Sequence, residues 1–125
     1  QNLICLGYPD KERYSLFLNA CDLFVLPLRD TRINRGRWPN KIGDYLCAGR
    51  PIVTTGVGDI MYYIENYRIG KIYDGTAQGL TDVLDPIVAG NDCLKELSRD
   101  SRSVAEDVLS FDKRVDKLLD FMDEE

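Results

Sequence analysis

The chain has 125 residues, of which 44% are hydrophobic and 30% are charged, and its net charge is −5 at neutral pH. This length fits one domain that can bury a core without disulfides or metal. Histidine is absent, which excludes the commonest general base and zinc ligand from this chain. Because the sequence has neither a long apolar run nor a signal-peptide pattern, we expect a cytoplasmic location.

Charge is distributed unevenly along the chain. Residues 1–73 carry ten basic and seven acidic side chains (+3), whereas residues 74–125 carry six and fourteen (−8). Such an acidic half argues against nucleic-acid binding, which needs a broad basic surface. The local exception is 28–41, where five basic residues face only Asp30, a patch suited to one anionic ligand. These residues are Arg29, Arg32, Arg35, Arg37 and Lys41.

The four cysteines lack the paired spacing of a metal or redox site. Three of them lie in apolar strand or helix contexts, so we expect free thiols that are mostly buried. They are Cys5, Cys21, Cys47 and Cys93.

Short apolar segments alternate with helical patterns along the chain. The sequence predicts four strands, at 3–6, 22–27, 51–55 and 70–74. Helices are predicted at 11–20, at 39–49, after Asp59, from 76 to about 88, at about 91–109 and at 111–123. The strands are almost continuously apolar, which is typical of parallel strands covered on both faces. The fold class is therefore α/β, with a parallel sheet of about four strands flanked by helices.

The helix at 39–49 has two distinct faces. Pro39 suits its first turn, and Gly49 suits the left-handed residue that ends it. One face carries the apolar residues of a packed core. The other face is polar and consists of Asn40, Lys41 and Asp44.

Two connections follow strands directly and are candidates for a ligand site. One is a loop of about a dozen residues after Pro27, which is long for a compact domain. The other is the turn at 55–58, which contains Gly56 and Gly58 and leads into Asp59, a predicted helix N-cap. In open parallel sheets, ligands bind beyond the carboxyl ends of the strands, so both connections should open onto that edge. The polar face of the helix at 39–49 starts there too, and Asp44 is expected to point toward the same edge.

Ordered motifs extend this interpretation to a known family. They resemble the carboxyl-terminal domain of group 1 glycosyltransferases, which are retaining GT-B enzymes that use nucleotide-sugar donors. The motifs lie at 6–8, 19–27, 39–51 and 56–59. The resemblance implies that residues 1–125 form a single Rossmann-like, nucleotide-sugar-binding domain. It also implies an incomplete fragment, with acceptor-binding residues on a missing amino-terminal domain.

The resemblance also suggests roles for individual residues. The family has two glutamates separated by seven residues, one near the donor sugar and one on the nucleotide ribose. Asp44 matches the second glutamate, whereas the first has no direct counterpart and Asp30 is the candidate for its place. The family's own diphosphate residues would precede residue 1. From their charge and their place near the start of the helix, Arg37 and Lys41 are candidates for the diphosphate in this chain. Lys41 could instead pair with Asp44, and the arginine-rich loop could be solvated or form an interdomain contact.

Other candidate residues carry two interpretations each. Gly56 and Gly58 permit close backbone approach to a ligand or simply form a turn. Asn40 shares the polar helix face with the predicted ligand residues. Trp38 could stack on a base or sugar, but an aromatic residue before a helix is more often a packing contact.

The implied function is the donor-binding half of a hexosyltransferase that transfers a sugar with retention of configuration, in glycan biosynthesis. The donor is a nucleotide sugar, the acceptor is a glycan or a lipid-linked sugar, and neither a cofactor nor an obligatory metal is expected. The missing domain would complete the site, so we expect this chain alone to be inactive, and that domain could hold the enzyme at a membrane surface. The alternative is a non-catalytic or degenerate Rossmann-like binding or regulatory domain.

Overall fold

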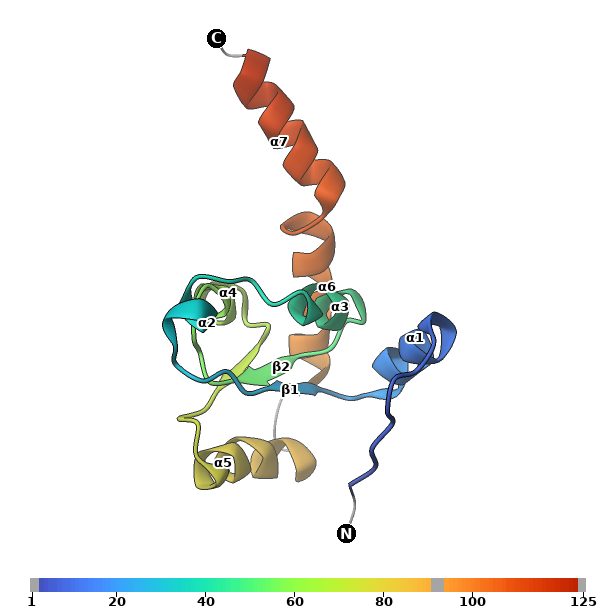
Figure 1. Ribbon diagram of the computed structural model, residues 1–125, viewed down its shortest axis with the longest axis vertical. Coiled ribbons are helices and arrows are strands. Elements are labelled where there is room, and N and C mark those ends of the chain that lie inside the picture. The colour runs from blue at the N-terminus through green and yellow to red at the C-terminus, as the bar shows by residue number, and fades with distance from the viewer. Residues whose placement is uncertain (1–2, 91–93, 124–125) are drawn as a thin grey trace.

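The sheet at the centre of the molecule has three parallel strands in the order β1-β2-β3 (Figure 1). The computed structural model describes residues 3–90 and 94–123. In the register, Val25 pairs with Val53, and Val53 pairs with Lys71. The strands are β1 (Phe24–Leu26), β2 (Ile52–Thr54) and β3 (Gly70–Ile72). This arrangement confirms the predicted Rossmann-like α/β class with a parallel sheet.

Helices connect and flank these strands. They are α1 (Lys11–Ala20), α2 (Arg32–Arg35), α3 (Lys41–Cys47), α4 (Ile60–Tyr67), α5 (Ala77–Val88), α6 (Leu94–Asp107) and α7 (Phe111–Asp123). The helix predicted at about 91–109 corresponds to α6. The first residues of that prediction, 91–93, lie outside the described residues.

The first predicted strand, at 3–6, is not a strand in the structure. Leu3, Ile4 and Leu6 are 77%, 81% and 55% exposed, and the described part of the chain pairs β1 with β2 alone. An apolar run becomes a strand only where a neighbouring strand accepts and donates its backbone hydrogen bonds. The apolar sequence of this segment fits a strand, but in the described residues no neighbouring strand pairs with it.

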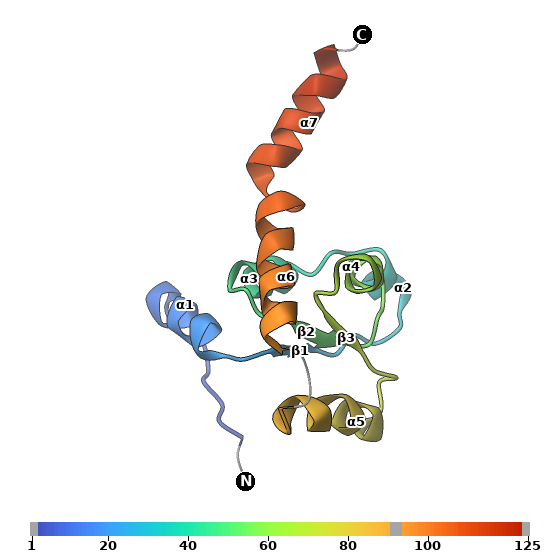
Figure 2. The same cartoon turned by 180° about the vertical axis from the view of Figure 1, so that it is seen from behind.

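Helices cover the two faces of the sheet unequally. α5 lies on one face, whereas α3, α4 and α6 lie on the other (Figures 1 and 2). Neighbouring residues of β2 separate accordingly, because Ile52 joins the core beneath α3, α4 and α6 while Val53 packs with Ile87 of α5. Alternation of side chains along the central strand therefore builds two cores.

The helix that the sequence predicted at 39–49 forms between Lys41 and Cys47. Ile42 and Leu46 are completely buried, which confirms the predicted core face. Gly49 has a φ of +65°, so it ends the helix in the left-handed conformation as expected. α6 packs against α3 and holds it from outside.

A short helix interrupts the loop that was predicted after Pro27. α2 forms because the Thr31 hydroxyl accepts a hydrogen bond from the backbone N–H of Asn34 at 3.2 Å. The Asn34 amide donates in turn to the carbonyl of Arg29 at 2.7 Å. These local bonds give the backbone a helical turn that hydrophobic periodicity does not reveal.

Asp59 precedes α4 as predicted, but its side chain makes no capping hydrogen bond. Its backbone is already helical, with φ −62° and ψ −21°, whereas a capping side chain usually projects from an extended residue.

The predicted burial of the cysteines is wrong for two of them. Cys5 and Cys47 are exposed and Cys21 is half-buried, while Cys93 lies outside the described residues. Cys5 belongs to the segment that forms no strand, and Cys47 lies on the outer side of the last turn of α3. The three described thiols are free, as expected.

α1 and α7 differ from the helices over the sheet in burial. Neither contains a buried residue, and α7 projects away from the sheet (Figure 1). α1 is capped by Asp10, whose carboxylate accepts from the backbone N–H of Arg13 at 2.8 Å. Its position next to α3 therefore depends on a small number of side-chain contacts.

Candidate functional site

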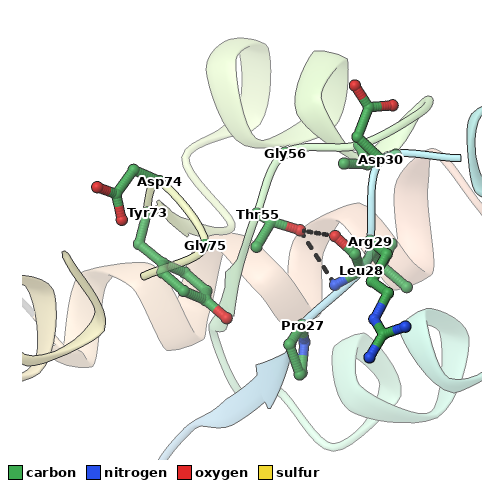
Figure 3. A pocket seen from close by; sticks show the side chains of 10 residues that line it. Pro27, Leu28, Arg29, Asp30, Thr55, Gly56, Tyr73, Asp74 and Gly75 are labelled. Carbon is green, nitrogen blue, oxygen red and sulfur yellow. Dashed lines mark hydrogen bonds between the residues drawn. The ribbon is translucent and has the colours of Figure 1, made fainter. Parts of the chain in front are cut away.

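A cavity of about 650 Å³ lies at the carboxyl ends of all three strands (Figure 3). Its walls are the residues that follow the strands directly. They are Pro27, Leu28, Arg29, Asp30, Thr55, Gly56, Val57, Tyr73, Asp74 and Gly75. The loop after β1 and the turn after β2 thus open onto the same edge, as the strand-end rule predicted.

Thr55 joins two walls of this strand-end cavity. Its hydroxyl accepts from the backbone N–H of Leu28 at 3.0 Å and donates to the carbonyl of Leu28 at 2.6 Å (Figure 3). Beneath it, the buried Thr54 hydroxyl donates to the carbonyl of Leu26 at 2.7 Å. These bonds fix the ends of β1 and β2 relative to each other, so this wall is formed before a ligand arrives.

Asp30 forms a two-bond ion pair with Arg35. The Arg35 Nε and Nη2 atoms donate to the two carboxylate oxygens at 2.5 and 2.6 Å. This hydrogen-bonded contact lowers the pKa of Asp30, so its carboxylate is ionised at neutral pH. The pair also neutralises one arginine of the basic patch. Asp30 and Arg29 leave the chain in opposite directions (Figure 3).

The two glycines of the turn after β2 are explained by their packing. Gly56 and Gly58 have φ values of +66° and +79°, which L side chains rarely adopt. A Cβ on Gly58 would lie 2.9 Å from the carbonyl oxygen of Asn34, and one on Gly56 would lie 3.0 Å from the Ile72 side chain. Gly56 lines the strand-end cavity, and both glycines line a smaller cavity beside Asp30 and Arg35.

Tyr73 and Asp74 complete the strand-end cavity after β3. Tyr73 is 8% exposed, and its ring extends toward Pro27 (Figure 3). Asp74 turns away and accepts bonds from the Thr76 hydroxyl and backbone N–H at 2.6 and 2.9 Å. The hydrogen bond from the Thr76 hydroxyl is the main cause of the lowered pKa of Asp74. Sequence reasoning did not name Tyr73, and it included Thr55 only as the first residue of the turn at 55–58, although the strand-end rule identifies both.

Lys41 and Asp44 lie elsewhere, on the side of α3 that faces α1. Asp44 accepts a hydrogen bond from the Tyr14 hydroxyl at 2.9 Å. It lines a cavity of about 300 Å³ with Ser15, Leu18, Asn19, Cys47, Ala48 and Arg102. Lys41 lines a second cavity of about 240 Å³, which is mostly apolar and includes Tyr14, Phe17, Phe24 and Tyr45. Asp44 therefore points toward α1 and not toward the strand-end edge that the sequence had suggested.

Arg37 and Asn40 are both exposed. Among the described residues, neither belongs to the walls of the strand-end cavity or of the two cavities between α1 and α3. Asn40 precedes α3 in a helical conformation and makes no capping bond. Trp38 packs against the core, with its ring centroid 5.1 Å from that of Tyr63, which favours the packing interpretation.

The structure thus brings the predicted residues together in two groups. Asp30, Gly56 and Gly58 lie around the carboxyl ends of the strands, and Lys41 and Asp44 lie between α3 and α1. In the described residues there is no group of acids and cysteines arranged to hold a metal ion. Nor does this part of the chain contain a helix with the length and apolar character needed to cross a bilayer.

Comparison with known protein families identifies the family to which this chain belongs. The family model for group 1 glycosyl transferases matches residues 1–90, which include the sheet, the strand-end cavity and the face of α3 that carries Asp44. The chain belongs to the group 1 glycosyltransferases. No significant match is found among curated proteins or solved structures. This membership supports glycosyl transfer as the reaction class, and it implies use of a sugar donor and an acceptor.

In this glycosyltransferase domain, α6 and α7 lie beyond the matched residues. α6 nevertheless packs on α3, and its Arg102 guanidinium donates to the carbonyl of Cys47 at the end of α3. The unmatched part of the chain therefore supports the helix that carries Asp44.

Proposed function

We propose that this chain is the donor-binding domain of a retaining hexosyltransferase that uses a nucleotide sugar. The observation that carries the proposal is the cavity at the carboxyl ends of a parallel sheet in a member of the group 1 family. Open α/β sheets bind nucleotides at this edge, where loops rather than regular backbone face the ligand.

The two groups of residues suit two ends of an extended donor. Asp44 accepts hydrogen bonds from the ribose hydroxyls, because a carboxylate forms charge-assisted bonds with such donors. Lys41 and Arg37 contact the diphosphate, and the apolar cavity beside Lys41, with its stacked Phe24 and Tyr45 rings, accommodates the base. Asn40 precedes these groups on the same polar face.

The sugar end of the donor occupies the strand-end cavity. Bond cleavage between the sugar and the diphosphate leaves positive charge on the anomeric carbon and negative charge on the leaving group. Asp30, which stays ionised, stabilises the first, while the basic side chains stabilise the second. Because Gly56 and Gly58 have no side chains, the backbone N–H groups of the turn can approach the ligand closely. No cofactor or metal takes part in this scheme.

Other parts of the proposal concern the complete enzyme. The acceptor, a glycan or a lipid-linked sugar, binds to a separate amino-terminal domain, which closes the site. The enzyme works in the cytoplasm, and the additional domain provides any contact with the membrane surface. The product enters glycan biosynthesis.

Isothermal titration with UDP, GDP and their sugars tests the donor-binding role. Replacing Asp44 by alanine should weaken binding by roughly 1.5–3 kcal/mol, the range for a hydrogen bond to a charged group. Asp44→Asn should also weaken binding, because the amide keeps the shape but loses the charge. The 2′,3′-dideoxy nucleotides should bind wild type and Asp44→Ala equally.

Asp85→Ala is a matched control, since Asp85 is an exposed acid on α5, on the other face of the sheet. It should leave all affinities unchanged. If wild type binds neither UDP, GDP nor their sugars, the chain is not a donor-binding domain. Equal preference for ribose over dideoxyribose in wild type and Asp44→Ala would remove Asp44 from the site.

A further inference from the structure

A single polar contact connects α1 to the predicted ribose ligand. The hydroxyl of Tyr14 donates to Oδ2 of Asp44 at 2.9 Å, across a sequence separation of 30 residues. α1 has no buried residue of its own. The contact is therefore one of the few interactions that position α1 against α3, and it acts on the carboxylate itself.

This contact leaves most of the carboxylate available. An ionised carboxylate has two oxygens and about four lone-pair positions. In the described part of the chain, the structure records one hydrogen bond to the Asp44 carboxylate, and that bond uses Oδ2. The other oxygen and the second position on Oδ2 remain for two vicinal hydroxyls. Tyr14 and a ribose can thus share the carboxylate without competing.

A carboxylate on an exposed helix face otherwise samples several rotamers. Binding a ribose would then require one rotamer to be selected, at an entropy cost. The Tyr14 side chain is half-buried and lines the apolar cavity with Phe17, Phe24 and Tyr45. Its hydroxyl reaches Oδ2 of Asp44 from α1, so this bond can fix the direction of the carboxylate.

We propose that Tyr14 is a positioning residue that orients the Asp44 carboxylate for the two ribose hydroxyls of the donor nucleotide. This inference rests on the proposed function, in which Asp44 is the ribose ligand. Tyr14 acts through Asp44 and does not contact the reacting atoms. Hydrogen-bond partners of ligand-binding side chains commonly have this role.

The hydroxyl is suited to donate over the whole working range of pH. Partial desolvation and the hydrogen bond to Asp44 raise the pKa of Tyr14 to about 12. The phenol is therefore protonated under ordinary assay conditions, and Asp44 remains the acceptor.

Titration calorimetry with UDP and GDP, each compared with its 2′,3′-dideoxy form, tests this role. Tyr14→Phe should weaken binding of the hydroxylated nucleotide by about tenfold, the lower end of the range for supporting partners of ligand residues. It should leave the dideoxy affinity unchanged, because Asp44 does not contact that ligand. A residue that merely stabilised the fold would change both affinities together.

Tyr8→Phe is the matched control, since Tyr8 is fully exposed and loses the same hydroxyl. It should bind all ligands as wild type does. In the double variant Tyr14→Phe/Asp44→Ala, affinity should equal that of Asp44→Ala alone, because the two side chains act as a unit. Thermal unfolding of each variant separates these effects from loss of the fold.

The outcomes distinguish this inference from the proposed function. If Asp44→Ala loses the ribose preference but Tyr14→Phe keeps it, or binds more tightly, the positioning role is overturned and the donor site stands. Equal weakening of both ligands by Tyr14→Phe also overturns it. If Asp44→Ala retains the wild-type preference, the ribose assignment fails and the inference fails with it.

Discussion

Among the described residues, the Arg35 guanidinium is paired with the Asp30 carboxylate. The proposed mechanism gives this carboxylate a further partner, the donor sugar. Both groups of the ion pair are largely exposed, so the pair contributes little to stability by itself. Its effect is on geometry and charge, because two short bonds hold the carboxylate beside the turn that contains Gly56. Arg35 therefore keeps Asp30 ionised and limits how much negative charge it offers.

Arg35→Gln should raise the pKa of Asp30 toward its ordinary value, since the charged hydrogen-bond donor is the main cause of its lowering. A lowered folded-state pKa stabilises the fold above the unfolded pKa, about 3.9, and this contribution disappears as the pH falls through the folded value. Carbon-detected NMR titration of the Asp30 carboxyl measures this pKa in wild type and in Arg35→Gln. Arg32→Gln, which removes a nearby exposed arginine, is the control, and an unchanged Asp30 midpoint in Arg35→Gln would show that the pair does not form in solution.

Sequence reasoning identified the residue types of the site better than their contacts. Asp44 and Lys41 were predicted from one helix face, and that face exists. The Tyr14 contact to Asp44 could not be predicted, because it joins two helices that are separated along the chain by β1 and α2. Nor could the bond between Asp30 and Arg35, because the helical turn of α2 brings them together and was itself predicted as loop.

At the scale of elements, the turn after β2 depends on its contact with α2. A Cβ on Gly58 would lie 2.9 Å from the carbonyl oxygen of Asn34 and 3.3 Å from that of Arg35, so α2 and this turn approach each other closely at a position that has no side chain. Because both segments border the cavity beside Asp30, this contact sets the position of one wall of the proposed site.

Gly58→Ala should lower the free energy of unfolding by about 1–3 kcal/mol, the range for strained backbone positions. The alanine would combine a φ of +79° with a Cβ 2.9 Å from a backbone oxygen. Gly36→Ala is the control, because Gly36 has a negative φ and its nearest atom to an added Cβ lies 3.7 Å away. Urea unfolding measures both variants. Equal stability of Gly58→Ala and wild type would mean that α2 moves freely relative to the turn.

Apart from the segment 3–6, each predicted strand and helix appears in the part of the chain that the structure describes. α5 begins after Thr76, whose hydroxyl accepts from the backbone N–H of Gly79, as an N-cap does. The segment 3–6 is the instructive failure, because its apolar sequence satisfies the strand pattern while its backbone finds no partner. An apolar run therefore predicts a buried strand only where another strand lies alongside it.

At the scale of the molecule, the described chain has a sheet with an unpaired edge at β1 and two separate groups of candidate ligand residues. The strand-end cavity has walls from three loops, and the Asp44 cavity has walls from α1, α3 and α6. In the proposed function these surfaces hold a donor, but transfer also needs an acceptor held in line with the sugar and protected from water.

We therefore expect the chain to bind a nucleotide sugar without transferring the sugar. Holding two reactants in the correct geometry lowers the activation barrier by about 7–11 kcal/mol in well-oriented reactions. This lowering is missing when the acceptor has no site. The measurement is release of UDP or GDP from the corresponding nucleotide sugar, at chain concentrations where calorimetry shows saturation. Asp44→Ala, tested in parallel, controls for contaminating hydrolases, because it should reduce any turnover that belongs to this chain. Turnover above the blank in wild type, lost in Asp44→Ala, would show that these 125 residues contain a complete site and would overturn the two-domain proposal.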